Sequence, residues 1–276
     1  MSQPLLIPRP PIHRSVLPAC LFAIEIASAI LAGAAHAADV AAPAAVKAPA
    51  AAPAYQWSGC YAGLNAGGGA SASSFTTTVG AGTFLVGSDP ATVSNDGTGA
   101  GSGSNFLGGG QAGCNWQSGT VVFGFEGDFD YYRSNSNFLN NTNTLAAGTT
   151  FGIGQSLKTD YLATVRPRIG IAADRNFFYV TGGVAFTEAH YSESYSDGAG
   201  GIGFAAASKF LTGWTAGAGW EHAWSEHWIF RIEYLFAGFG TTTAAGFITG
   251  PGGSNPLHGS GDLIIQVARA GVNFKF

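Results

Sequence analysis

The sequence predicts an all-β fold, an eight-stranded antiparallel up-and-down barrel that spans a membrane, and three observations lead to it. Only 10% of the 276 residues are charged, whereas 46% are hydrophobic and 42 are glycine, which leaves few charges for a soluble surface. No stretch after residue 37 is apolar for the roughly eighteen residues that a membrane helix requires. Segments of about ten residues instead alternate apolar and polar side chains, as in a membrane barrel.

The N-terminal part has the features of a secretory signal peptide over residues 1–37. A basic start and an apolar stretch precede the small-residue sequence Ala35-His36-Ala37, so we expect cleavage between Ala37 and Ala38. The mature chain would therefore begin outside the cytoplasm.

Two further segments follow this signal. Residues 38–54 are mostly alanine, proline and valine, a composition that cannot form a core and predicts an extended periplasmic linker. Residues 55–276 carry the alternating segments and are the expected barrel domain.

Eight strands are expected in the barrel domain, joined alternately by short turns and by long tracts of Gly, Ser, Thr and Asn. Their expected ranges are 57–67, 106–116, 120–132, 158–172, 177–190, 212–222, 228–238 and 263–276. The short turns, on the periplasmic side, would cover 117–119, 173–176 and 223–227. The long connections, expected as four exposed outer loops, would cover about 68–105, 133–157, 191–211 and 239–262.

Alternate residues of a strand face opposite sides of the barrel wall, so parity separates lipid-facing from lumen-facing side chains. In the third strand Phe123, Phe125 and Phe129 share one face, and Glu126 and Asp128 share the other. The same sorting leaves no charge on the lipid face of the apolar band, where Arg or Lys would cost about 2–4 kcal/mol. The expected lumen charges are Glu126, Asp128, Asp130, Asp160, Glu221 and Glu233, with Lys158, Arg166, Arg168, Arg231, Arg269 and Lys275.

These charges predict a lumen closed by salt bridges, because an eight-stranded barrel is just wide enough for its own side chains to fill. Counting along the strands places Glu126 beside Arg166, Glu233 near Arg269 and Glu221 near Arg231. The alternative is a porin that passes small solutes. Whether the charges are paired separates the two.

Motifs along the barrel domain resemble a known family. They are WSGCYAGLNAGGG at 57–69, GGGQAGCNW at 108–116, FGFEGDFDY at 123–131, VRPRIGIA at 165–172, YVTGGVAF at 179–186, GWTAGAGWEHAW at 213–224, FRIEYLFAGFG at 230–240 and ARAGVNFKF at 268–276. In this order they resemble the small outer-membrane β-barrel proteins of alphaproteobacteria, often labelled immunogenic porins, which belong with OmpA-like and opacity-type barrels. The C-terminal Phe274 and Phe276 resemble the signal by which the outer-membrane assembly machinery takes up barrels.

The resemblance implies a surface protein of the outer membrane with a structural role in the envelope, no enzymatic activity and no cofactor. Its expected partners are outer-membrane lipid and lipopolysaccharide, the assembly machinery, and peptidoglycan or a host surface. The net charge of −4 does not suggest nucleic acid as a partner. Rival functions are the small-solute porin, a loop-based adhesin or haem receptor, and a lipid A acyl hydrolase. For the hydrolase, Glu188, His190 and Ser192 alternate near the outer end of the fifth strand, a weak signal.

Tryptophans gather at the expected periplasmic end of the barrel and predict an aromatic girdle there. They are Trp57, Trp116, Trp220, Trp224 and Trp228.

Two cysteines, Cys60 and Cys114, belong to the expected mature chain. If Trp57 and Gln117 flank the same rim, the register places the cysteines directly opposite each other, and an exported chain favours a disulfide. The alternative is a pair of small apolar side chains that face lipid.

Overall fold

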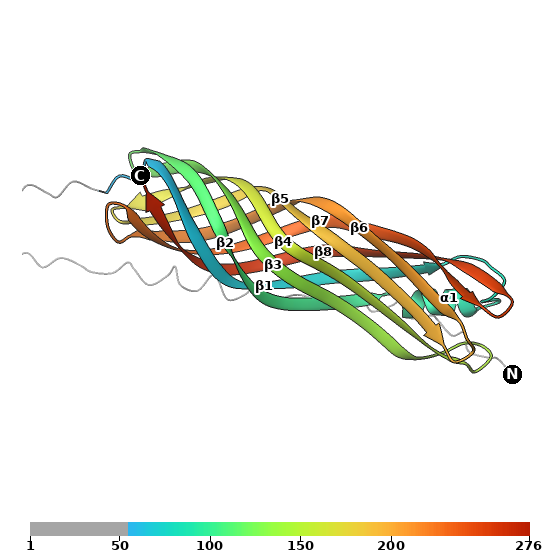
Figure 1. Ribbon diagram of the computed structural model, residues 1–276. Helices are drawn as coiled ribbons and strands as arrows, with labels where there is room; N and C mark the ends of the chain where they lie inside the picture. The colour runs from blue at the N-terminus through green and yellow to red at the C-terminus, as the bar shows by residue number, and fades with distance from the viewer. Residues whose placement is uncertain (1–54) are drawn as a thin grey trace, which may run out of the picture. The chain divides into compact units, whose positions relative to one another are not determined.

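The computed structural model describes residues 55–276, so the signal peptide and linker predicted for residues 1–54 lie outside the described residues. The described chain forms a closed antiparallel barrel in which each strand pairs with its sequence neighbours and β1 pairs with β8 (Figure 1). The strands are β1 Gly59–Val79, β2 Gly99–Ser118, β3 Val121–Thr144, β4 Thr150–Ala173, β5 Asn176–Asp197, β6 Ile202–Ala223, β7 Trp228–Gly250 and β8 Gly253–Lys275. The predicted eight-stranded barrel is therefore confirmed.

The strands are much longer than predicted at the end away from the C-terminus. Most of the four expected loops is strand, and the connections there shrink to 80–98, 145–149, 198–201 and 251–252. The Gly, Ser, Thr and Asn tracts that suggested loops continue the hydrogen-bonded ladder, which satisfies their backbone groups. Their inward side chains still pack, as Phe75, Tyr191 and Tyr195 show by their burial.

One short helix, α1 (Asp89–Asp96), lies in the connection between β1 and β2, at the end of the barrel opposite the C-terminal residue (Figure 1). We call this the α1 end and the other the C-terminal end. In the part of the chain that the structure describes, no helix is long and apolar enough to cross a membrane.

The outer face carries a continuous belt of exposed apolar side chains. On β3 it runs from Val121, 44% exposed, to Tyr131, 57% exposed, with Phe123, Phe125 and Phe129 between them. Ten residues of strand tilted by about 40° span about 25 Å, the height of a hydrocarbon band. The next outward residues of β3 after Tyr131 are polar: Arg133, Asn135 and Asn137.

Parity reverses within β4, and two predicted lumen charges are therefore wrong. A bulge in the β4–β5 ladder between Thr159 and Ala163 adds a residue to β4. Beyond it the inward positions are Leu157 and Thr159, whereas Lys158 is exposed and Asp160 has a side chain 46% exposed. Lys158 and Asp160 consequently lie on the outside of the barrel.

The interior is built in layers along the barrel axis. At the C-terminal end, Trp57 packs against Tyr55 and Phe177 in a buried aromatic cluster. Above the charged layer, Leu107, Tyr132 and other buried residues form a second, larger apolar cluster that reaches Leu85 and Val93 beside and within α1. Its other large members are Leu162, Leu211, Leu235, Ile265 and Val267.

Candidate functional site

The charged layer lies between these two apolar clusters and is the most distinctive feature of the lumen. Every guanidinium and carboxylate in it belongs to a side chain at most 2% exposed. Among the described residues, the layer contains one more carboxylate than it has guanidinium groups. Its members are Glu126, Asp128, Asp130, Glu221 and Glu233, with Arg166, Arg168, Arg231 and Arg269.

Glu126, on β3, lies at the centre of the network. Its carboxylate accepts hydrogen bonds from Arg231 at 2.7 Å, Arg166 at 2.8 Å and Arg168 at 3.4 Å, and from the Tyr61 hydroxyl. The β3–β4 register makes Glu126 the partner of Arg166, as predicted from counting. Arg166 also binds Asp128 and Glu233, so it has further partners beside Glu126.

Glu233 and Arg269 form the second centre, on β7 and β8. Arg269 Nη2 lies 2.6 Å from Glu233 Oε2, and its Nη1 lies 3.1 Å from Asp128 Oδ1. The same Nη1 also pairs with the carboxylate of Asp130. Within the described chain, Arg269 is the single ion-pair partner of Asp130.

The count correctly placed Glu221 near Arg231, since the two are register partners across β6 and β7, but among the described residues no salt bridge joins them. The Glu221 carboxylate accepts from Arg168 Nη1 at 2.6 Å. The long side chain of Arg231 instead extends to Glu126 at 2.7 Å and to Glu233 at 2.8 Å. Strand register positions Cα atoms, and the reach of the arginine side chain then selects the carboxylate.

Tyrosines complete the layer, and the charge analysis of the sequence missed them. Arg168 lies over the rings of Tyr61 at 4.7 Å and Tyr179 at 5.1 Å. The Tyr179 hydroxyl donates to Glu233 at 3.0 Å and accepts from Arg231 at 3.2 Å. Both tyrosines have inward parity, which is the signal that could have identified them.

The predicted aromatic girdle is present, with one correction. Trp116, Trp224 and Trp228 are 48%, 81% and 50% exposed on the outside. Trp57 is instead fully buried, because its indole turns into the barrel and donates to the Asp174 carbonyl at 3.1 Å. Gly59, with φ of +134°, provides the bend by which the chain passes from this plug into β1.

Lys275 also belongs to the C-terminal mouth of the barrel and not to the charged layer. Its ammonium donates to the Gln56 carbonyl and lies 4.4 Å from the centre of the Tyr55 ring. Burial raises the pKa of Tyr55 to about 12. With Trp57, these side chains close the mouth.

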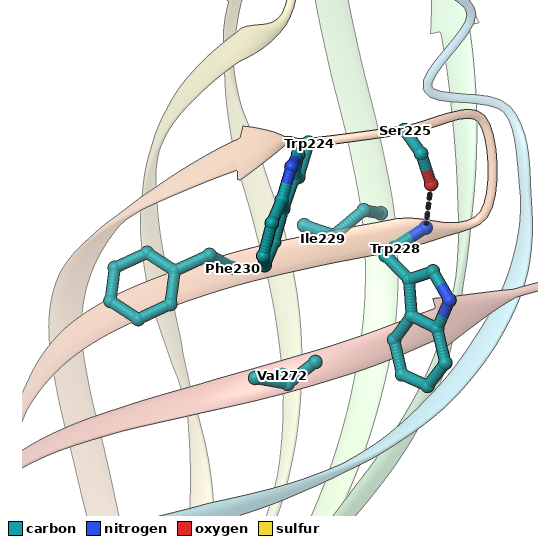
Figure 2. Close-up of a pocket in the computed structure, with 6 residues that line it drawn as sticks. All are labelled: Trp224, Ser225, Trp228, Ile229, Phe230 and Val272. Atoms are coloured by element: carbon teal, nitrogen blue, oxygen red, sulfur yellow. Dashed lines mark hydrogen bonds between the residues drawn. The ribbon is translucent and has the colours of Figure 1, made fainter.

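An apolar pocket of about 420 Å³ lies on the outer wall at the same end (Figure 2). Trp224 and Trp228 flank it, and the Trp228 backbone N–H donates to Ser225 Oγ at 3.1 Å. Ile229, Phe230 and Val272 complete the lining. The pocket is part of the girdle and faces the surroundings of the barrel, not its lumen.

Cys60 and Cys114 are register partners on β1 and β2, with Cα atoms 4.0 Å apart, and their sulfur atoms are bonded in a disulfide. It lies on the outer face near the C-terminal end. Phe274 and Phe276 are exposed on the same face, at 41% and 72%.

Glu188, His190 and Ser192 share the outer face of β5, but the structure gives His190 other partners. Its Nδ1 lies 2.7 Å from Ser208 Oγ on β6, and its Nε2 lies 3.6 Å from Asp160 on β4. The residues of the predicted hydrolase order are therefore not assembled with one another.

Glu193 is a second buried acid that the sequence analysis did not single out. It is 1% exposed and lies seven residues beyond Phe186, the last apolar outward residue of β5, so it is outside the membrane band. The Tyr191 hydroxyl donates to it at 3.0 Å and Gln155 Nε2 at 3.2 Å. Burial raises the pKa of Glu193, and these hydrogen bonds offset the rise only in part.

Comparisons with known proteins agree with this geometry. The model of the outer membrane protein β-barrel domain family matches residues 29–276. The 31 kDa outer-membrane immunogenic protein of Brucella melitensis is 34% identical over 191 residues, 67% of this chain and 72% of that protein. The 25 kDa outer-membrane immunogenic protein of Brucella abortus is 28% identical over 81% of each chain.

Among solved structures, OprG from Pseudomonas aeruginosa is similar with a TM-score of 0.40 and 12% identity, over 80% of this chain and 98% of OprG. So loose a likeness adds nothing to the fold described above. Neither the family description nor the names of the Brucella relatives indicates an enzyme. The chain belongs to the outer membrane protein β-barrel domain family and is a protein of the outer membrane.

Proposed function

We propose that the protein is a structural surface protein of the outer membrane with a closed lumen. The observation that carries this proposal is the salt-bridged layer of four arginines and five carboxylates, enclosed between two apolar clusters. A water-filled path would have to cross all three layers. Buried charges of this kind are tolerated only when each is paired. The network pairs them inside the lumen of an eight-stranded barrel, which is just wide enough to be filled by side chains.

The surface role is supported by the relatives that are named immunogenic proteins and by the long strand extensions at the α1 end. Short turns and the C-terminus characterise the periplasmic end of such barrels, which directs α1 and residues 80–98 outward. These connections present the protein to antibodies or neighbouring surfaces. Small-solute transport is the second candidate, but the occupied lumen disfavours it.

Export and assembly follow from the same proposal. We expect cleavage between Ala37 and Ala38, a periplasmic linker over 38–54 and recognition of Phe274 and Phe276 by the assembly machinery. The exposure of Phe274, on β8, and of Phe276, directly after it, supports that recognition. Outer-membrane lipid and lipopolysaccharide surround the apolar belt, and peptidoglycan is a candidate contact for the linker.

Gene deletion with complementation tests the structural role. We expect the deleted strain to admit a large antibiotic or detergent that the wild type excludes, and the intact gene to restore the barrier. A complementing gene for the Glu226→Gln variant, whose side chain is 70% exposed and lies outside the lumen, is the matched control. Unchanged sensitivity on deletion, together with slower uptake of small solutes, would refute the structural role in favour of a porin.

A further inference from the structure

The connection between β1 and β2 lies at the mouth of the barrel at the α1 end (Figure 1). It covers residues 80–98 and contains α1, and we call it the lid segment. Two of its apolar side chains, Leu85 and Val93, are 2% and 0% exposed and belong to the larger apolar cluster of the lumen. The lid segment is therefore docked on the barrel by its own side chains.

Most polar contacts of the lid segment are independent of pH. Asn255, on β8, accepts from the Leu85 backbone N–H at 2.7 Å and donates to the Gly80 carbonyl at 3.0 Å. The Val79 backbone N–H donates to Ser94 Oγ on α1 at 2.9 Å. None of these groups titrates, so these contacts hold the first half of the lid segment and the middle of α1 at every pH.

The residue that follows α1 is held by a side chain of the lumen. Gly97 is buried, and its carbonyl accepts from the hydroxyl of Thr77, on β1, at 3.0 Å. Among the described residues, no other group donates to this carbonyl. A buried carbonyl without a donor is unfavourable, so this hydrogen bond contributes to the docking of α1.

The Thr77 hydroxyl is shared with the buried acid Glu193. It also contacts the Glu193 carboxyl, and its oxygen accepts from Gln155 Nε2 at 2.7 Å. A hydroxyl has one proton to donate, so it cannot donate to the Gly97 carbonyl and to an ionised Glu193 at the same time. The protonation state of Glu193 therefore decides which of the two acceptors receives the Thr77 proton.

Each state of the Glu193 carboxyl has one consistent arrangement of protons. When Glu193 is protonated, its O–H donates to Thr77 Oγ1, and the Thr77 proton remains on the Gly97 carbonyl. When Glu193 is ionised, it can only accept, and it is the stronger acceptor. The Thr77 proton then turns to the carboxylate, and the Gly97 carbonyl is left buried without a donor.

The groups around Glu193 leave this carboxyl as the one that changes. Tyr191 donates to it at 3.0 Å, and burial raises the pKa of that hydroxyl. β1 and β4 face it with the neutral Thr77 and Gln155, and among the described residues no cation forms an ion pair with it. The other titratable side chains of the surrounding elements at this end are Tyr195 and Asp197 on β5, His258 and Asp262 on β8, and Asp89 and Asp96 on α1.

We propose that the lid segment is a pH-sensitive lid, closed while Glu193 is protonated and released at Gly97 when Glu193 ionises. Burial raises the pKa of Glu193, so docking is complete below the pKa of a free carboxyl and weakens as the pH rises above it. The charged layer stays in place in both states. The inference therefore goes beyond the structural role proposed above and changes only the surface presented at the α1 end.

Hydrogen exchange of the refolded barrel in micelles, followed by mass spectrometry, tests the lid. Exchange rates of peptides from 85–98 are divided by their intrinsic rates near about pH 4 and near about pH 8, which gives a protection factor at each pH. One test variant is Glu193→Gln, whose amide can donate to Thr77 as the protonated acid does. The other is Thr77→Val, which removes the shared hydroxyl.

Two matched controls accompany these variants. Glu188→Gln replaces an exposed acid on the outer face of the same strand, and Thr77→Ser keeps the hydroxyl. A change of electrophoretic mobility on heating shows that each variant is folded.

In the wild type we expect the protection factor of the lid segment to fall about tenfold from the lower to the higher pH, the effect of one buried hydrogen-bonding group. Glu193→Gln should keep high protection at both pH values, and Thr77→Val should show low protection at both. Both controls should behave as the wild type.

Equal protection of the wild-type lid segment at the two pH values would overturn the proposal. An undiminished fall in Glu193→Gln would do the same, because the fall would then not originate at this carboxyl. A fall of equal size in all the strands would show a loss of stability of the whole barrel and would refute a lid.

Discussion

Removing Arg269 should destabilise the barrel more than removing any other single charge of the lumen. Arg269→Met leaves Asp130 without a cation and takes one guanidinium from Glu233 and Asp128. The layer already holds one excess carboxylate, and the substitution raises this excess to two. Removing one partner of a buried ion pair costs about 3–5 kcal/mol of stability. Because Arg269→Met removes a partner from three carboxylates, we expect its cost at the upper limit, about 5 kcal/mol.

Two comparison variants make the magnitude testable. In Glu126→Gln, Arg166, Arg168 and Arg231 each keep another carboxylate, so the cost should fall at the lower limit, about 3 kcal/mol. Arg133→Gln breaks a pair whose side chains are 69% and 46% exposed, and it should cost less than about 1 kcal/mol.

The assay is urea unfolding of each variant in lipid vesicles, followed by tryptophan fluorescence and by the heat-dependent change in mobility. The order of the three free energies of unfolding is the critical result. If Glu126→Gln lowers the free energy of unfolding more than Arg269→Met does, the cost of a substitution in this lumen does not depend on the number of ion-pair partners that remain. Equal costs for Arg269→Met and Arg133→Gln would refute the network as a source of stability.

Further predictions concern the two ends of the barrel and the N-terminus. Because burial raises the pKa of Glu193, ionising this carboxyl opposes folding once the pH exceeds the pKa of a free carboxyl. The Glu193→Gln variant should therefore unfold at the same temperature as the wild type near about pH 4 and at a higher temperature near about pH 8. Glu226→Gln, at an exposed residue, should leave the unfolding temperature unchanged at both pH values. Denatured, unreduced protein from the outer membrane should contain no reactive thiol, and two labelled thiols per chain would contradict the Cys60–Cys114 bridge. Reduction of this bridge should speed unfolding more than it alters the fold. N-terminal sequencing of the membrane-extracted protein should begin at Ala38, and a chain that retains residues 1–37 would refute the signal peptide.

The barrel and its charged lumen could be predicted because period-two alternation is a local property of the sequence. Phe123, Glu126 and Arg166 needed only parity to be assigned to their faces, and the even number of strands followed from the alternation of turns and longer connections. The opposition of Cys60 and Cys114 followed from placing Trp57 and Gln117 at the same rim, since the long connection between β1 and β2 does not itself fix their register.

The features that were not predicted depend on local backbone geometry and strand pairing, which no pattern of residues in the sequence reveals. The bulge between Thr159 and Ala163 reverses the parity of β4, and it moved Lys158 and Asp160 from the lumen to the outer wall. The predicted first strand includes Trp57, but β1 begins at Gly59, and Trp57 is buried in the mouth of the barrel instead of standing in the girdle. The strand extensions were hidden by loop-like composition, although their ladder partners supply the hydrogen bonds that composition cannot reveal.

Contacts across several strands were also beyond the sequence. His190 meets Ser208 and Asp160 through the β5–β6 register and the β4 bulge together, and Glu221 meets Arg168 through the length of the arginine side chain. Such partners require the closed barrel to be known first.

Single-channel recording of the purified, refolded protein in a planar bilayer tests the closed lumen most directly. We expect the wild type to insert without steady conductance, because the Glu126 and Glu233 networks fill the charged layer between two apolar clusters. Arg133→Gln, which exchanges an exposed residue of the outer wall, should be equally silent. Steady wild-type currents that are unaffected by Arg269→Met would contradict the plug and show that ions pass through this barrel.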